Sequence, residues 1–294
     1  MLEFIMTVAI SGAGKTTWAH KYDDTHLVID SDEMRARLLG DATDQTQNSR
    51  VFDEMYRITC NALAAEQSVI YCATNLSSKR RISLIKSLRH RFPNVFYRCV
   101  VISAPIEVCR ERNSARSRVV PAWVLDKQIR QFQFPLPNEG FDEIKLIQTV
   151  SMWDIMTNGL SIWKKVENYG SQHNPHHSLT LLDHCNKCCG YVDEKWPENN
   201  DLINAALFHD VGKIYTGIHW DTDEDPETLH YPSHSNYSTV IAMSMDLSIR
   251  SLQLISLHMI GYEDEKAQKT WRARAGEDLW VDLEKLFEAD RAAH

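Results

Sequence analysis

Apolar residues are spaced differently in the two halves of the chain, and the difference predicts two kinds of fold. In the first half, short β-rich apolar runs alternate with longer stretches of helical spacing. The runs lie at residues 4–11, 26–30, 68–73 and 95–103. Strands that are apolar throughout and separated by helices are typical of a parallel sheet covered on both faces. We therefore expect an α/β domain over residues 1–150.

The pattern changes near residue 150, beyond which strand signals are few and apolar residues recur at helical spacing. We expect helices around five stretches, at residues 179–192, 201–210, 236–245, 251–260 and 279–290. The sequence therefore predicts an all-α domain over residues 151–294, with the join falling within residues 141–160.

Composition is that of a soluble globular protein, since 43% of the 294 residues are apolar and 24% are charged. No apolar run approaches the length of a membrane span, and the apolar start "MLEFIMTVAIS" reads as a first strand rather than a signal peptide. The odd number of cysteines, seven, argues against a disulfide framework. Cys185, Cys188 and Cys189 lack the second pair that a zinc site needs, so we expect them to be structural. A cytoplasmic protein with no membrane partner fits these features best.

Charge is divided unevenly between the halves. Residues 1–150 hold 20 basic and 17 acidic residues, whereas residues 151–294 hold 12 basic and 23 acidic residues and ten of the 13 histidines. An acidic, histidine-rich half suits metal ions and disfavours a broad nucleic-acid surface. The acidic run at residues 220–227 is equally well explained by solubility.

The stretch "AISGAGKTT" (9–17) matches the phosphate-binding pattern G-x-x-x-x-G-K-[ST], except that Ala9 replaces the first glycine. A predicted strand precedes it and a predicted helix follows, which is the context that the motif requires. Backbone N–H groups of such a loop surround the phosphates, while the lysine reaches the β- and γ-phosphates and the threonine hydroxyl binds Mg²⁺. The predicted site for ATP, or another nucleoside triphosphate, comprises Gly12, Ala13, Gly14, Lys15, Thr16 and Thr17.

Two further segments indicate which type of reaction the nucleotide site could perform. The stretch "VIDSDEMRARL" (28–38) ends a strand and opens a helix, which puts Asp32 near the phosphates and Arg35 one helical turn further on. A carboxylate there can accept the proton of an attacking hydroxyl, as a kinase requires, although Asp32 could also cap the helix. Residues 109–121 carry four arginines, which could close over a transferring phosphoryl group or form an ordinary basic helix.

Together these segments resemble the phage-type 5′-hydroxyl polynucleotide kinases over about the first 140 residues. The matching pieces are "SGAGKTTWA", "DSDEMR", "ATNLSSKRR" and "ERNSARSRVVP". The resemblance implies that Lys15 and Thr16 contact ATP and Mg²⁺ and that Asp32 is the general base. It further implies that Arg35 engages the acceptor nucleotide and that Arg112 and Arg116 clamp the donor phosphates.

The chain departs from that family at one place. The family usually has an aspartate just before Thr-Asn, where this chain has Cys72 and Ala73. Either Mg²⁺ is held with less help from the protein, or another acid, such as Asp30, compensates.

The second half contains a spaced series of histidines and aspartates, each on or beside an apolar helical stretch: His184, His209, Asp210, His234, His258 and Asp290. Imidazole and carboxylate together suit Mn, Fe, Co, Ni or Zn. The series resembles the HD-domain phosphohydrolases over residues 151–294. The resemblance implies one metal held by His184, His209, Asp210 and Asp290, and a second held by His234 and His258 with Asp210 as the bridge. Lys213 would steady the phosphate, and His177 would contact it.

The pairing of a 5′-hydroxyl kinase with a phosphohydrolase resembles the end-healing enzymes of nucleic-acid repair. We expect phosphorylation of 5′-hydroxyl ends and removal of 2′,3′-cyclic, 2′- or 3′-phosphates from RNA or DNA, with an RNA ligase as a partner in the same pathway. Three alternatives stay open on the sequence: a small-molecule or nucleoside kinase fused to a nucleotidase, a nucleotide-sensing module with an inactive HD domain, and a structural subunit of a repair complex.

Overall fold

The computed structural model describes residues 1–116, 119–174 and 178–293. The chain divides into two compact units by its internal contacts. We call the first the α/β unit, which comprises residues 1–104, 108–120 and 139–149, and the second the helical unit, which comprises residues 105–107, 121–138 and 150–294. The predicted domain limits, 1–150 and 151–294, stay a prediction. The helical unit has its long continuous stretch from Val150 onward but also takes two segments from the first half.

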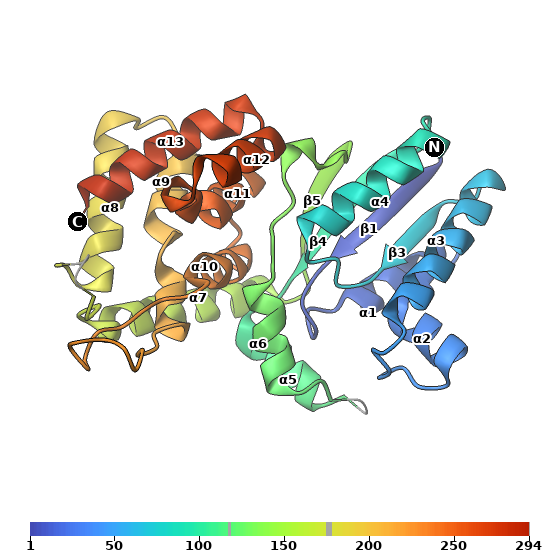
Figure 1. The fold of residues 1–294 in the computed structure, drawn as a ribbon, viewed down its shortest axis with the longest axis horizontal. Helices are drawn as coiled ribbons and strands as arrows, with labels where there is room; N and C mark the ends of the chain where they lie inside the picture. The colour runs from blue at the N-terminus through green and yellow to red at the C-terminus, as the bar shows by residue number, and fades with distance from the viewer. Residues whose placement is uncertain (117–118, 175–177, 294) are drawn as a thin grey trace. The chain divides into compact units, whose positions relative to one another are not determined.

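The α/β unit is built on a parallel sheet with strand order β2-β3-β1-β4-β5 in the described part of the chain (Figure 1). The strands are β1 (Glu3–Val8), β2 (Leu27–Asp30), β3 (Val69–Cys72), β4 (Phe96–Ser103) and β5 (Glu143–Gln148). The expectation of a parallel sheet with intervening helices is confirmed. The strand β5 was not expected, because its sequence EIKLIQ mixes charged and apolar residues and it lies half-exposed at the edge of the sheet.

Helices connect the strands of the α/β unit, as parallel pairing requires. They are α1 (Lys15–Ala19), the 3₁₀ turn η1 (His20–Tyr22), α2 (Ser31–Leu39), α3 (Asn48–Ala64), α4 (Ser78–Arg91), α5 (Ile106–Ser114) and the 3₁₀ turn η2 (Pro137–Glu139). The last two are shared with the helical unit: α5 belongs to the α/β unit from residue 108 onward, and η2 belongs to it only at residue 139. α2 begins where the Asp30 side chain caps it and ends at Gly40, which adopts a left-handed φ of +76°.

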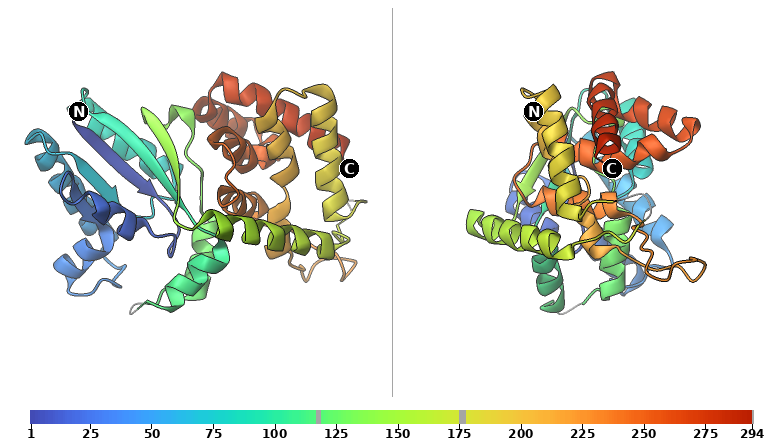
Figure 2. Two further views of the ribbon diagram at one scale, coloured as in Figure 1. Left: turned by 180° about the vertical axis from the view of Figure 1, so that it is seen from behind. Right: turned by 90° about the vertical axis from the view of Figure 1, so that its left-hand side faces the viewer.

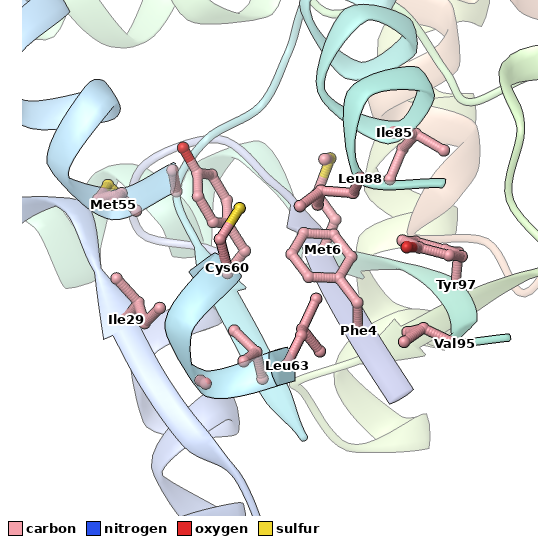
Figure 3. Close-up of a cluster of buried hydrophobic side chains, with 14 of the residues drawn as sticks. Phe4, Met6, Ile29, Met55, Cys60, Leu63, Ile85, Leu88, Val95 and Tyr97 are labelled. Carbon is pink, nitrogen blue, oxygen red and sulfur yellow. The ribbon is translucent and has the colours of Figure 1, made fainter. Parts of the chain in front are cut away.

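One apolar cluster joins the sheet to two of these helices. Figure 3 shows Leu63 of α3 and Leu88 of α4 beside Phe4 of β1 and Tyr97 of β4. All four side chains are at most 2% exposed, so α3 and α4 are held on the sheet mainly by apolar burial. This packing anchors the sheet, and the phosphate-binding loop follows the carboxyl end of β1.

The helical unit contains helices and loops, with isolated bridges between Ser171 and Thr180 and between Ile218 and His230 in its described part. Its α-helices are α6 (Ala122–Arg130), α7 (Met152–Tyr169), α8 (Leu181–Lys195), α9 (Asn200–Phe208), α10 (His234–Met243), α11 (Ile249–Leu257), α12 (Glu265–Ala275) and α13 (Glu277–Ala292). Two 3₁₀ segments follow α9 and α11, namely η3 (Val211–Tyr215) and η4 (His258–Tyr262). Both views of Figure 2 show the yellow to red part of the chain as a bundle of helices joined by loops.

The bundle is organised around neighbouring helix pairs: α8 packs against α9 and α13, and α11 packs against α9 and α10. All seven cysteines of the chain lie in the described residues and outside any disulfide, and Cys185 and Cys188 are buried within α8. In residues 1–116, 119–174 and 178–293, no helix has both the length and the apolar character needed to cross a bilayer.

Candidate active sites

The phosphate-binding loop follows β1 and leads directly into α1. Gly12 and Gly14 have φ values of +86° and +95°, which favour glycine. A Cβ atom on Gly12 would lie 2.2 Å from the carbonyl oxygen of Cys109 in α5, so no larger residue fits there without moving that backbone. Lys15 is the first residue of α1, and its side chain is buried. The loop therefore has the geometry that the sequence predicts for a phosphate site.

Thr16 faces the start of α2. Its hydroxyl donates to Asp30 Oδ2 over 3.0 Å, and Asp30 Oδ1 accepts from the backbone N–H groups of Asp32 and Glu33 over 2.7 and 3.4 Å. Asp30 itself is 4% exposed. The carboxylate thus links the residue expected to bind Mg²⁺ with the helix that carries Asp32.

Asp32 and Arg35 lie together on the first turn of α2. Arg35 Nη1 donates to Asp32 Oδ1 over 2.7 Å, while the Asp32 side chain remains 48% exposed. Arg35 is buried and also donates from Nη2 to the side-chain oxygen of Asn48 over 3.0 Å. Asn48, the first residue of α3, was not anticipated from the sequence because a lone asparagine at a helix start carries no functional signal.

Arg112 of α5 lies beside the phosphate-binding loop through a contact with Thr149. Arg112 donates from Nη1 to Thr149 Oγ1 over 2.9 Å and from Nη2 to the Thr149 carbonyl over 2.8 Å. The Thr149 hydroxyl donates to the carbonyl of Ala13 in the loop over 2.8 Å. Arg116, by contrast, lies beyond the end of α5 with its side chain exposed. No motif pointed to Thr149, which follows the unexpected strand β5.

In the helical unit, the structure brings the six predicted metal-ligating residues together from several elements. They are His184 in α8, His209 at the end of α9, Asp210 before η3, His234 at the start of α10, His258 at the start of η4, and Asp290 in α13. Each is less than 9% exposed. Residues more than a hundred positions apart in sequence therefore share one buried site.

The six side chains form two groups that share Asp210. Among the described residues, His184, His209 and Asp210 form one group of possible metal ligands, and Asp210, His234 and His258 form another. Asp210 Oδ2 lies 3.2 Å from His184 Nε2, and Asp210 Oδ1 lies 3.1 Å from His234 Nε2. Asp290 Oδ1 joins the first group at 3.3 Å from His184 Nε2. Asp210 thus presents one oxygen to each group.

Backbone carbonyls orient three of the imidazoles. The Nδ1 atoms of His209, His234 and His258 lie 2.7, 2.7 and 2.8 Å from the carbonyl oxygens three residues earlier in the chain. A carbonyl can only accept, so each Nδ1 carries a hydrogen, and each ring in its neutral form directs the lone pair of Nε2 inward. This is the tautomer that a metal ligand requires.

The donor atoms fit a metal cation. His184 Nε2 lies 3.1 Å from His209 Nε2, and His234 Nε2 lies 3.0 Å from His258 Nε2. Lone pairs facing each other at such distances repel unless a proton or a cation lies between them. Imidazole nitrogens with carboxylate oxygens are ligands that Mn, Fe, Co, Ni and Zn accept. These residues could therefore hold one or two transition-metal ions.

The electrostatics of the cluster favour cations. Burial opposes ionisation of Asp210, but the ammonium of Lys213 and the imidazole of His209 hold its pKa well below the ordinary value. The pKa of Asp290 is likewise held low, because hydrogen bonds from His184 and His209 outweigh its burial. Burial would lower the pKa of His209, yet the adjacent Asp210 and Asp290 carboxylates raise it to about 10. The two ionised carboxylates therefore attract either protons or a metal.

Lys213 is buried beside this cluster. Its Nζ lies 2.6 Å from Asp210 Oδ2 and donates to Gln172 Oε1 over 2.8 Å. Gln172 is fully buried and lies in the segment ahead of α8 where the sequence pointed to His177 instead. His177 itself lies outside the described residues. A lone glutamine carries no functional signal in a sequence, whereas the histidines of that segment do.

Two other contacts complete the site. The hydroxyl of Tyr262 donates to Asp290 Oδ2 over 3.0 Å, which leaves Oδ1 facing the histidines. A Cβ atom on Gly212 would lie 2.2 Å from the carbonyl oxygen of His234, so glycine is required for α10 to approach η3. Tyr262 carries no functional signal in the sequence, whereas Gly212 lies between Asp210 and Lys213, two residues already singled out.

Comparison with known proteins supports a P-loop kinase-like fold for the first part of the chain. A family profile described as "AAA domain" matches residues 4–135. No curated protein matches the chain in sequence. Together with the parallel sheet, the family match identifies the α/β unit as a P-loop kinase-like domain.

Several solved structures resemble part of the chain. One is a chain of the "Pnkp1/Rnl/Hen1 RNA repair complex", with 19% identity and a TM-score of 0.38, covering 44% of this chain and 43% of that one. A putative kinase from Chloroflexus aurantiacus has 15% identity and a TM-score of 0.43, covering 56% and 97%. A sugar kinase from a Janibacter species has 18% identity and a TM-score of 0.39, covering 55% and 94%. The matched region thus spans less than half of the RNA-repair chain.

Proposed function

We propose that this protein is a bifunctional enzyme that heals nucleic-acid ends. The α/β unit would transfer a phosphoryl group from ATP to a 5′-hydroxyl end, and the helical unit would act as an HD-domain phosphohydrolase on a 2′,3′-cyclic, 2′- or 3′-phosphate. One observation carries the proposal: a phosphate-binding loop beside an exposed carboxylate occurs in the same chain as six buried histidine and aspartate side chains that converge around Asp210.

In the kinase reaction, the backbone of the loop and Lys15 would bind the ATP phosphates. Asp32, which is half-exposed, would accept the proton of the attacking 5′-hydroxyl. Arg35 holds one oxygen of Asp32 at 2.7 Å and so fixes the direction of the carboxylate. Arg112 would add positive charge at the donor phosphates, where it stabilises the charge that develops during transfer. Mg²⁺, when bound, neutralises phosphate charge.

In the hydrolytic reaction, the residues that would hold the metals are His184, His209, Asp210, Asp290, His234 and His258. A bound transition metal supplies Lewis acidity and lowers the pKa of coordinated water. The role of this chain is to keep the imidazole lone pairs directed inward and the carboxylates ionised. Lys213 places an ammonium group at the edge of the cluster, where it would bind a phosphate oxygen. The bundle shields these groups from solvent, which strengthens their charge interactions.

The test is an oligoribonucleotide with a 5′-hydroxyl and a 2′,3′-cyclic phosphate, incubated with the protein, ATP, Mg²⁺ and Mn²⁺ and then analysed by mass. We expect one phosphate gained at the 5′ end and a hydroxyl at the 3′ end. Asp32→Asn should reduce the 5′ reaction about 10²- to 10⁴-fold, the typical contribution of a general base, and leave the 3′ reaction intact. His209→Ala should do the reverse, so each variant is the other's control.

Other outcomes would redirect the proposal. Phosphorylation of nucleosides or sugar alcohols without any change to RNA or DNA ends would contradict the end-healing function and favour a small-molecule kinase. A 5′ gain without a 3′ change would limit the proposal to the kinase. Full 5′ activity in Asp32→Asn would show that another group accepts the proton.

A further inference from the structure

The α/β unit lacks an acid at the place where the 5′-hydroxyl polynucleotide kinases that it resembles usually have an aspartate. β3 ends at Cys72 and Ala73 follows it, and both residues are buried. Mg²⁺ takes oxygen ligands, and neither a cysteine nor an alanine side chain supplies one.

The adjacent strand carries an acid at the same level of the sheet. β2 pairs with β3 in parallel, and Asp30 is the register partner of Cys72. Neighbouring strands lie about 4.8 Å apart, so moving the acid from β3 to β2 displaces it by one strand spacing. The Thr16 hydroxyl, 3.0 Å from Asp30 Oδ2, lies within reach of a cation held there.

The two oxygens of Asp30 have different neighbours. Oδ1 accepts the backbone N–H groups of Asp32 and Glu33 and so caps α2, whereas Oδ2 faces Thr16. Capping needs only a side-chain oxygen, since asparagine and aspartate cap helices about equally well. A carboxylate is buried at a cost unless it is hydrogen-bonded or paired, and Asp30 presents Oδ2 to Thr16 while Oδ1 caps α2, so its position suits a cation as well as the cap.

We propose that Asp30 is the acidic residue of the Mg²⁺ site in the α/β unit and replaces the acid that is absent from β3. Thr16 and Asp30 would hold the ion from the loop and from β2. The inference rests on the proposed use of ATP and deepens it by naming the metal-binding carboxylate. It does not depend on which acceptor receives the phosphate.

The test is Asp30→Asn in the full-length chain, because this change removes the charge and retains the cap. Binding of a non-hydrolysable ATP analogue is measured calorimetrically across a Mg²⁺ titration and in excess EDTA. We expect Mg²⁺ to tighten binding to the wild type, and we expect Asp30→Asn to lose this gain by about tenfold or more, as for one charge-assisted ligand. Affinity in EDTA should not fall. Asp264→Asn is the matched control, since Asp264 also caps a helix, α12, through one oxygen.

A second variant moves the acid back to β3. Asp30→Asn combined with Cys72→Asp should recover most of the Mg²⁺ dependence, which a general loss of folding could not do. An undiminished Mg²⁺ effect in Asp30→Asn would overturn the proposal, as would a wild type that binds no nucleotide. Mg²⁺-dependent nucleotide binding without phosphorylation of any 5′-hydroxyl end would instead overturn the end-healing function and leave the role of Asp30 standing.

Discussion

The two candidate sites are built in opposite ways. In the α/β unit, the phosphate-binding elements are consecutive, from Gly12 to Thr16, and much of the binding surface is backbone. In the helical unit, the site consists of side chains that start at His184 and end at Asp290, each supplied by a different turn or helix. The first kind of site depends on local backbone shape, whereas the second depends on the folding of a whole bundle.

The same contrast appears in the electrostatics. Asp32 in the α/β unit stays half-exposed with one arginine partner. Asp210 in the helical unit is 3% exposed and touches four histidines and a lysine. A buried carboxylate with so many partners cannot lose its charge without leaving those partners uncompensated. Substitutions in the helical site should therefore reduce activity more than substitutions in the α/β site.

The largest effect is expected from Asp210→Asn, because Asp210 is shared by both groups of metal-binding residues. Hydrolysis should fall by about 10³-fold or more, since the contribution of a metal Lewis acid is several kcal/mol. Bound metal, measured by elemental analysis, should fall as well, while 5′-kinase activity should not change. Asp183→Asn is the control, because Asp183 lies next to His184 in α8 but is exposed. Wild-type metal content and activity in Asp210→Asn would contradict the assignment of the cluster.

A smaller loss of activity is expected from Gly12→Ala. The added Cβ would meet the Cys109 carbonyl at 2.2 Å, so the loop must shift by about an ångström, and such misplacement costs about 10²-fold in activity. Nucleotide affinity measured by calorimetry should fall, and the rate of the 3′ reaction should not change. Gly40→Ala is the control, because Gly40 also has a positive φ but has open space around its Cβ position. Equal losses in both variants would mean that backbone strain, and not the clash with α5, determines the result.

The contrast between the sites also explains what the sequence could predict. The phosphate loop was predictable because its glycines and Lys15 stand at fixed spacing between a strand and a helix. The histidine and aspartate series was recognisable only by resemblance to a family, since nothing in the spacing of His184 and Asp290 says that they meet. The structure brings them together, while their role as ligands stays a prediction.

The features that were missed share a physical cause. β5 was missed because an edge strand needs no continuous apolar run, and the parts of the helical unit at residues 121–138 lie in the first half of the chain. Thr149, Gln172 and Tyr262 each act through hydrogen bonds to residues distant in sequence. A single polar residue has no periodicity and no motif, so only the folded chain reveals it.

Tyr262→Phe tests one of these missed contacts in the helical unit. The change removes the hydrogen bond to Asp290 Oδ2 and keeps the ring, so the carboxylate loses its fixed orientation. Removing such an outer partner of a metal ligand weakens metal affinity by 10- to 100-fold in known sites, and we expect about tenfold because Tyr262 is 55% exposed. Metal affinity is measured by competition with a chelator. The control is Tyr191→Phe, whose hydroxyl contacts Glu288 on the surface; the same loss in that variant would exclude a specific role for Tyr262.

Thr149→Val tests the corresponding contact in the α/β unit, and it should have the smallest effect. Valine keeps the shape of threonine but removes the hydroxyl that accepts from Arg112 and donates to the Ala13 carbonyl. The second bond from Arg112, to the Thr149 backbone carbonyl, remains, so the arginine is loosened and not released. One net hydrogen bond is worth about 1 kcal/mol, which corresponds to a rise of about fivefold in the KM for ATP. The KM for the acceptor should not change, and Thr149→Ser should restore the wild-type value. A fall in kcat with an unchanged KM for ATP would show instead that Thr149 acts on the chemical step, and the local backbone site would then depend on side-chain positioning as much as the buried cluster does.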